Sequence, residues 1–160
     1  LAKAKMSVGR MLPTSGNVFL SIRDSDKQHL APVARSLVSM GFTVFTTSGT
    51  RELLASHSVD THLIRKISEG ARPNILDKIA NGEIDLIINT PTRTGGQTDE
   101  GQIRAMAVES RIPMITTMTG AVAAVAAIEA LRGGTWSVSA LQDYFGTAES
   151  PVACSQHAPA

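Results

Sequence analysis

The chain has 160 residues, of which 42% are hydrophobic and only 4% aromatic. This length suits one domain of ordinary size with an aliphatic core. The formal net charge of +1 is too small to suggest non-specific nucleic-acid binding. No apolar run approaches the roughly 20 residues that span a bilayer. The single cysteine, Cys154, permits no internal disulfide, so we expect a protein of the reducing cytoplasm. From the low charge and the short apolar runs, we expect no nucleic-acid or membrane partner.

The predicted elements alternate between strand and helix five times. Residues 1–16 read as a linker, because "LPTSG" breaks the helix-like "LAKAKM". Residues 147–160 are small and polar and are predicted to form a flexible tail. Strands are predicted at 17–22, 42–46, 60–64, 84–89 and 112–116, and helices at 27–41, 50–58, 73–82, 99–110, 119–134 and 139–145. This order predicts a three-layer α/β/α sandwich with a mainly parallel, five-stranded sheet over residues 17–146.

Helix starts and stops are indicated by particular residues. Asp26 and Asp99 are predicted to cap helices, and Pro73 is predicted to lie in the first turn of one. Pro32 conflicts with a regular helix interior, so we expect a kink or an irregular first turn there. Ser139 and Gln142 have capping-box spacing.

The loops that follow the predicted strands share a polar, cationic character. In an open α/β sheet, ligands bind outside the carboxyl ends of the strands. The loops there are "RDSDK", "TTSGT", "RKISEG", "NTPTRTGG" and "TTMTG". Hydroxyl groups and helix N-termini donate hydrogen bonds to anions, and lysine and arginine add charge. Such residues also occur in ordinary turns and caps, but their convergence from five loops favours a pocket for a phosphorylated small molecule.

A catalytic set is not apparent in these loops. The sequence contains no GxSxG, GxxxxGK[ST] or GxGxxG motif, and Ser48 has no base at a recognisable spacing. No histidine or cysteine has the spacing of a metal ligand, so no metal site is predicted.

Five motifs together resemble the methylglyoxal-synthase-like domain family. They are "FLSIRDSDK" (19–27), "TTSGT" (46–50), "KISEGARP" (66–73), "IINT" (87–90) and "ITTMTG" (115–120). Within that family, the chain is most similar to the C-terminal allosteric domains of carbamoyl-phosphate synthetase large chains, over residues 17–145. The lead-in "LAKAKM" resembles the helix that precedes those domains, which would make residues 1–16 a linker from a preceding synthetase domain.

The resemblance implies a regulatory domain that binds nucleotide monophosphates such as UMP or IMP. The positions carried over to this sequence are Lys27, Thr47, Thr50, Lys66 and Asn89. We add Ser48 and Thr90 as phosphate-side candidates, since they lie in the same loops. Thr116 matches a threonine near the family's ornithine site. Pro91 stands where the family has a threonine, which leaves the identity of the effector open.

The resemblance also implies partners and cofactors outside this chain. The longer parent would be an ATP-dependent, glutamine-hydrolysing ligase of pyrimidine and arginine biosynthesis. It would use ATP with Mg or Mn, and it would pair with a glutaminase small subunit. No cofactor is expected in this chain itself. A homo-oligomer is possible, because the Ala-rich segment 121–131 could pack in the core or against a second copy.

Two alternatives differ in class. A standalone methylglyoxal-synthase-like lyase would act on dihydroxyacetone phosphate, but its catalytic Asp corresponds to Arg72 here, and a cation cannot act as the general base. A neighbouring histidine of that enzyme corresponds to Gly96. The other alternative is a structural or oligomerisation module with a vestigial pocket.

Overall fold

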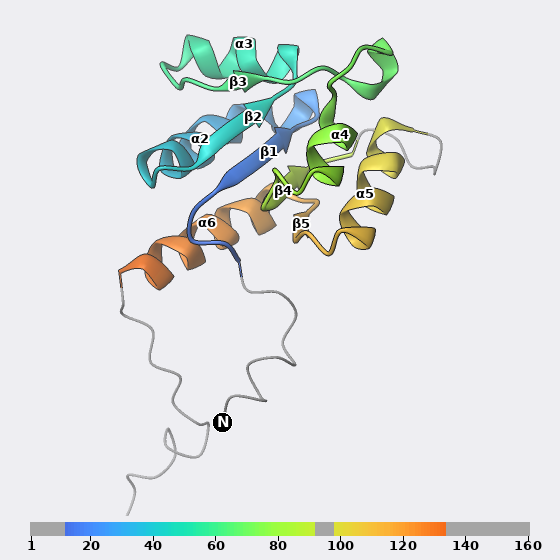
Figure 1. Ribbon diagram of the computed structural model, residues 1–160. Coiled ribbons are helices and arrows are strands. Elements are labelled where there is room, and N and C mark those ends of the chain that lie inside the picture. The colour runs from blue at the N-terminus through green and yellow to red at the C-terminus, as the bar shows by residue number, and fades with distance from the viewer. Residues whose placement is uncertain (1–11, 92–97, 134–160) are drawn as a thin grey trace, which may run out of the picture.

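The protein is built around one parallel sheet of five strands in the order β3-β2-β1-β4-β5 (Figure 1). The computed structural model describes residues 12–91 and 98–133. The predicted tail at 147–160, the capping box at Ser139 and Gln142, and most of the predicted linker lie outside these residues. The strands are β1 (Asn17–Ser21), β2 (Thr43–Thr46), β3 (His62–Leu63), β4 (Leu86–Asn89) and β5 (Met114–Ile115). The predicted parallel α/β architecture is confirmed.

Helices cover both faces of the sheet (Figure 1). Alternate residues of β1 point to opposite faces, so Leu20 packs into one apolar core and Phe19 into the other. The first core contains side chains of α2 (Leu30–Ser39), α3 (Ser48–Ser56) and α6 (Met118–Arg132). The second contains side chains of α4 (Ile75–Ala80) and α5 (Asp99–Glu109). The three layers are therefore those that the alternation of elements predicts.

The Ala-rich helix α6 contributes to the first core. Ala121, Val125 and Ile128 pack in this core, and Ala124 is also buried. Val122 is 53% exposed. One face of α6 is therefore part of the core, and another faces solvent.

Three predicted helix starts were wrong in detail. Asp26 lies inside a 3-10 turn, η1 (Asp24–His29), and pairs with Arg23 at 2.7 Å instead of capping a helix. Thr98 caps α5 by accepting from the Gly101 N–H, which leaves Asp99 as the first helical residue. The chain enters α4 through a capping box made by Asn74 and Asp77, so Pro73 precedes the cap. At α4 and α5, a neighbouring side chain satisfies the free N–H groups instead.

The irregular helix start near Pro32 is confirmed. The 3-10 turn η1 runs directly into α2, and Pro32 lies in the first turn of α2, where its missing N–H is not needed. A second 3-10 turn, η2 (Ile67–Glu69), follows β3. Both turns lie beyond the carboxyl ends of strands, and each carries polar side chains to that edge of the sheet.

Candidate functional site

A cavity of about 740 Å³ opens at the carboxyl edge of the sheet. The chain runs outward from β1 through β2 to β3, and then crosses to the other side of β1 to form β4 and β5. The loops after β1 and β4 therefore diverge at this point, which is where open α/β sheets bind ligands. The loops after four of the five strands line the cavity; the loop after β5 does not. The prediction of five converging loops was therefore wrong for the loop after β5.

One corner of the cavity is formed by the N-terminus of α3. Thr47 is the N-cap residue, but its side chain makes no capping hydrogen bond. The first N–H groups of a helix have no partner within the helix, and the helix dipole makes this end attractive to anions. The ammonium group of Lys27 lies next to this end, since its Nζ is 3.5 Å from the position that a Cβ on Gly49 would take. Two sources of positive potential are thus placed together.

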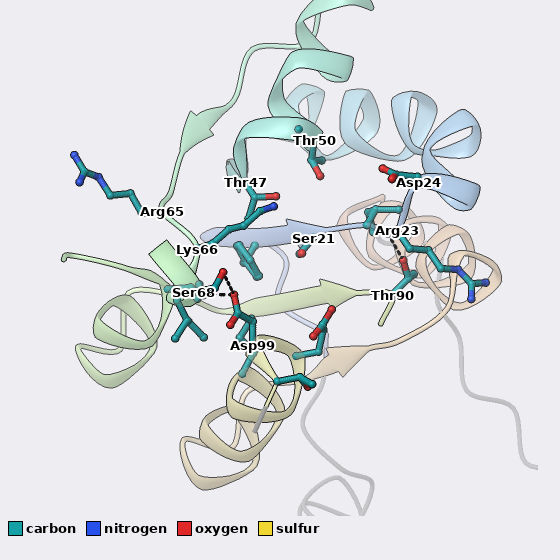
Figure 2. A pocket seen from close by; sticks show the side chains of 18 of the residues that line it. Ser21, Arg23, Asp24, Thr47, Thr50, Arg65, Lys66, Ser68, Thr90 and Asp99 are labelled. Carbon is teal, nitrogen blue, oxygen red and sulfur yellow. Dashed lines mark hydrogen bonds between the residues drawn. The ribbon is translucent and has the colours of Figure 1, made fainter. Parts of the chain in front are cut away.

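Lys66 lies on the opposite wall, and its side chain extends toward Thr47 (Figure 2). It has no ion-pair partner within residues 12–91 and 98–133. The pKa of Asp24 is lowered first by its hydrogen bond and charge interaction with Lys27, and to a smaller degree by the charge of Lys66. Asp24 therefore lies in the field of both lysines. Thr47 and Thr50 also face the cavity and are largely buried (Figure 2).

Asn89 provides a buried amide beside the cavity. It is 1% exposed, and neither its Oδ1 nor its Nδ2 has a hydrogen-bond partner among the described residues. In the sheet it is paired with Ser21, which lines the cavity, and the two side chains lie on the same face. Buried amides are almost always hydrogen-bonded, so these atoms are suited to a ligand or a bound water.

The far side of the cavity is acidic and apolar. The Asp99 carboxylate accepts hydrogen bonds from the N–H and the hydroxyl of Ser68, at 3.1 and 3.0 Å (Figure 2). This contact joins η2 to the start of α5. Apolar side chains of both layers also line the cavity: Phe19, Ile22, Ile67, Ile75 and Ile103. The cavity therefore has a cationic end, an apolar wall and an acidic end, which matches an anionic group attached to an organic body.

The structure brings most of the predicted site residues together. Lys27, Thr47, Thr50, Lys66 and Thr90 line the cavity. The Thr90 hydroxyl already has a partner within the protein, because its Oγ1 accepts a hydrogen bond from the Arg23 N–H at 3.0 Å. Three predicted residues do not line it: Ser48, Asn89 and Thr116. Ser48 is exposed, Asn89 is buried beside the lining residue Ser21, and Thr116 is exposed between β5 and α6.

Other lining residues were not predicted to belong to the site. Asp24 lies in the predicted loop "RDSDK", Asp99 was predicted only as a cap, and Ser21 and Ser68 were not singled out; all four line the cavity. A strand-end position is the signal that could have identified Ser21. Arg65 also borders the cavity, but its side chain points away from it (Figure 2).

Among the described residues, catalytic groups are not arranged around the cavity in a familiar pattern. Arg72 does not line it; its side chain is 80% exposed, and its Nη1 lies 3.3 Å from Asp77 Oδ1. Among the described residues, no group of three or more His, Cys, Asp or Glu side chains could hold a metal ion. In the same part of the chain, no helix is long and apolar enough to cross a membrane. The arrangement favours binding of an anionic ligand.

Comparisons with known proteins show the family and the fold of the chain. The MGS-like domain family matches residues 29–116. The chain is 46% identical to a carbamoyl phosphate synthase large chain of Archaeoglobus fulgidus, over 89% of this chain and 13% of that protein. It is 44% identical to a carbamoyl phosphate synthase large chain, C-terminal section, of Methanocaldococcus jannaschii, over 88% of this chain and 23% of that protein. The chain therefore spans less than a quarter of the length of these relatives.

Two solved structures share the fold. A methylglyoxal synthase from Elizabethkingia anophelis NUHP1 superposes with a TM-score of 0.58 at 16% identity, over 90% of this chain and 98% of that one. A structure named ForH gives a TM-score of 0.54 at 18% identity, over 76% of this chain and 83% of that one. At these identities the likeness concerns the fold alone, and it confirms the predicted methylglyoxal-synthase-like sandwich.

Proposed function

The chain belongs to the family of MGS-like domains, and from this premise we propose that it is the allosteric effector-binding domain of a carbamoyl phosphate synthase large chain. The support is the identity of 46% and 44% to proteins of that name, over nearly nine-tenths of this chain. The remainder of such a large chain would be its covalent partner and would carry the ATP- and metal-dependent ligase chemistry. A glutaminase small subunit would supply ammonia. Both would be cytoplasmic.

The effector in this proposal is a nucleoside monophosphate such as UMP or IMP. The observation that carries the proposal is the cationic corner, where Lys27, Lys66 and the uncapped N-terminus of α3 face one cavity. A phosphate there would accept hydrogen bonds from the α3 N–H groups and from Thr47 and Thr50. The cavity volume of about 740 Å³ is within the usual range for small-molecule sites.

Asn89 has a separate part in this proposal. Its buried amide carries both a donor and an acceptor that lack partners among the described residues. A ligand that reached it would satisfy both atoms, which adds affinity and favours ligands with a matching donor and acceptor. Ordinary apolar ligands would leave the amide unsatisfied.

Regulation would follow from differential affinity. An effector shifts the enzyme between states only if it binds one state more tightly. Thr116 lies apart from the cavity, on the exposed turn before α6, so an ornithine response would involve a neighbouring part of the enzyme. In this proposal the chain has a regulatory role and no catalytic one.

Isothermal titration calorimetry with UMP, IMP and ornithine tests the proposal. UMP or IMP should bind, and Lys66→Ala or Thr50→Val should weaken binding by about 1–3 kcal/mol, the scale of a lost hydrogen bond to a charged group. Arg104→Ala is the control, because it removes an exposed cation of α5 that does not line the cavity.

Two results would contradict the proposal. One is the absence of binding for both nucleotides at millimolar concentration. The other is production of methylglyoxal from dihydroxyacetone phosphate by the purified chain, which would favour the lyase alternative. Arg72 does not line the cavity, so its charge alone does not exclude the lyase reaction there. The methylglyoxal assay therefore decides between the two functions.

A further inference from the structure

The cationic corner already contains an anion that belongs to the protein. Asp24 is the first residue of η1, and its Oδ1 lies 2.6 Å from the Nζ of Lys27, one turn further along. The same Nζ lies beside Gly49 at the start of α3. The Asp24 carboxylate is therefore paired with the ammonium group that is placed to receive a phosphate.

The two members of this pair differ sharply in exposure. The Asp24 side chain is 91% exposed, whereas the Lys27 side chain is 23% exposed. The carboxylate can turn into water and remain hydrated, but the ammonium group is held against the wall of the cavity. The lysine is thus the fixed member of the pair, and the aspartate is the one that can be displaced.

The other acidic side chains near the cavity have partners of their own, so Asp24 is the carboxylate that competes with a phosphate for Lys27. Asp26, on the same 3-10 turn, is engaged with Arg23 at 2.7 Å. Asp99, on the opposite wall, accepts both hydrogen bonds of Ser68. Glu100 also borders the cavity at the start of α5 and has an interaction of its own. Lys66 is the second cation, and its charge also lowers the pKa of Asp24.

We propose that Asp24 is a built-in counter-anion that occupies Lys27 in the empty site and is displaced by the phosphate group of the effector. This inference rests on the proposed function, since it requires a phosphate to bind beside α3. The contact is then autoinhibitory: each phosphate-bearing ligand must break the Asp24–Lys27 pair before Lys27 can bind it. Inorganic phosphate makes few other contacts, so the cost of breaking the pair should leave most sites without it. A ligand that also fills the cavity gains further contacts and can still bind.

The variant Asp24→Asn tests this by calorimetry on the 160-residue chain at low ionic strength. The amide keeps the shape of the side chain and removes its charge. Affinity for inorganic phosphate and for UMP should rise by the same factor, about fivefold, which is the scale of a solvent-exposed ion pair. Binding of uridine, which lacks the phosphate, should not change. Glu69→Gln is the matched control, because Glu69 is an exposed acid on η2 that does not line the cavity.

A double-mutant cycle with Lys27→Ala separates competition from general electrostatics. In the Lys27→Ala background, most of the gain from Asp24→Asn should disappear, because no ammonium group remains to be released. A gain that persists undiminished, or an equal gain for uridine, would overturn the inference.

Failure of the inference is distinguishable from failure of the proposed function. If UMP binds the wild type and Asp24→Asn with equal affinity, Asp24 does not compete and the effector site stands. If UMP binds neither protein, the effector site is wrong and the inference falls with it. If UMP binds only Asp24→Asn, the inhibitory contact is supported in its strongest form.

Discussion

The two edges of the sheet are built in opposite ways. At the amino edge, the Asn17 N–H donates to Asp85 at 2.8 Å, and the Asn17 side chain donates to the Glu83 carbonyl at 2.6 Å. Arg132, at the end of α6, donates to the carbonyls of Thr14 and Met40. At the carboxyl edge, the N-terminus of α3 lacks a side-chain cap, and the Asn89 amide has no partner among the described residues.

This difference separates stability from binding. A polar group that is paired inside the protein stabilises the fold, but it has no capacity left for a ligand. A polar group without a partner costs stability and is available for binding. Substitutions at the amino edge should therefore lower stability and leave binding intact, whereas substitutions at the carboxyl edge should weaken binding without a loss of stability.

The largest effect on unfolding is expected at Gly16. Its φ of +116° is strained for other residues, and a Cβ there would lie 2.1 Å from Asp85 Oδ2, which is already bonded to Asn17. Gly16→Ala should lower the free energy of unfolding by about 3 kcal/mol, measured by urea denaturation. UMP affinity of the folded fraction should be unchanged.

Gly41→Ala is the control for backbone strain alone. Its φ is +84°, but no atom lies within 4 Å of the position that a Cβ would take there, so this substitution should cost only about 1 kcal/mol. Equal losses for the two variants would show that the Asp85 contact adds nothing, and the amino edge would then be less tightly bonded than its geometry indicates.

The next effect is expected at Asn89, with opposite signs for stability and binding. Asn89→Leu removes a buried amide that has no partner among the described residues, so it should raise the free energy of unfolding by about 1–2 kcal/mol. It should also weaken UMP binding. Both quantities come from thermal unfolding with and without UMP.

Asn74→Leu provides the matched comparison. Asn74 is also buried, at 6% exposure, but its side chain caps α4. Its replacement should cost about 1 kcal/mol of stability and leave UMP affinity unchanged. A loss of stability at both positions would mean that Asn89 is satisfied in the free protein.

The smallest effect concerns acid sensitivity. The Glu83 pKa lies below its ordinary value of 4.5, first because Lys78 bonds its carboxylate at 2.6 Å and then because Asn81 does. A lowered folded-state pKa contributes stability that is present above pH 4.5 and lost as the pH falls through the folded pKa. Glu83→Gln should therefore flatten the fall in melting temperature below that pH.

Asp24 allows the same acid-sensitivity test at the carboxyl edge. Its pKa is also lowered, from 3.8, chiefly by Lys27. If a bound phosphate displaces Asp24, saturating UMP should remove the contribution of Asp24 to the acid profile and leave that of Glu83.

Glu109→Gln, at the exposed end of α5, is the charge control for Glu83→Gln. An acid profile that is the same in wild type and Glu83→Gln would contradict the assignment to Lys78.

Local patterns predicted the elements but not their ends. β4 was clear because "LIIN" is buried on both faces, as expected for a central parallel strand. The cap at Asp99 was predicted from residue type alone, yet Thr98 takes that position and Asp99 turns to Ser68, 31 residues earlier. Cap preference acts over three residues, whereas this hydrogen bond depends on how two loops meet.

The order of strands and helices, the aliphatic layers and the loops that line the cavity follow from the amino-acid sequence. Hydrophobic periodicity and turn residues are local, so they can be read along the chain. Which loops meet depends on the tertiary structure, which places Lys27 and Lys66 across one cavity and leaves Arg72 and Thr116 outside it. These relations depend on strand order and side-chain exposure, which arise when the sheet forms and are not encoded in any single segment.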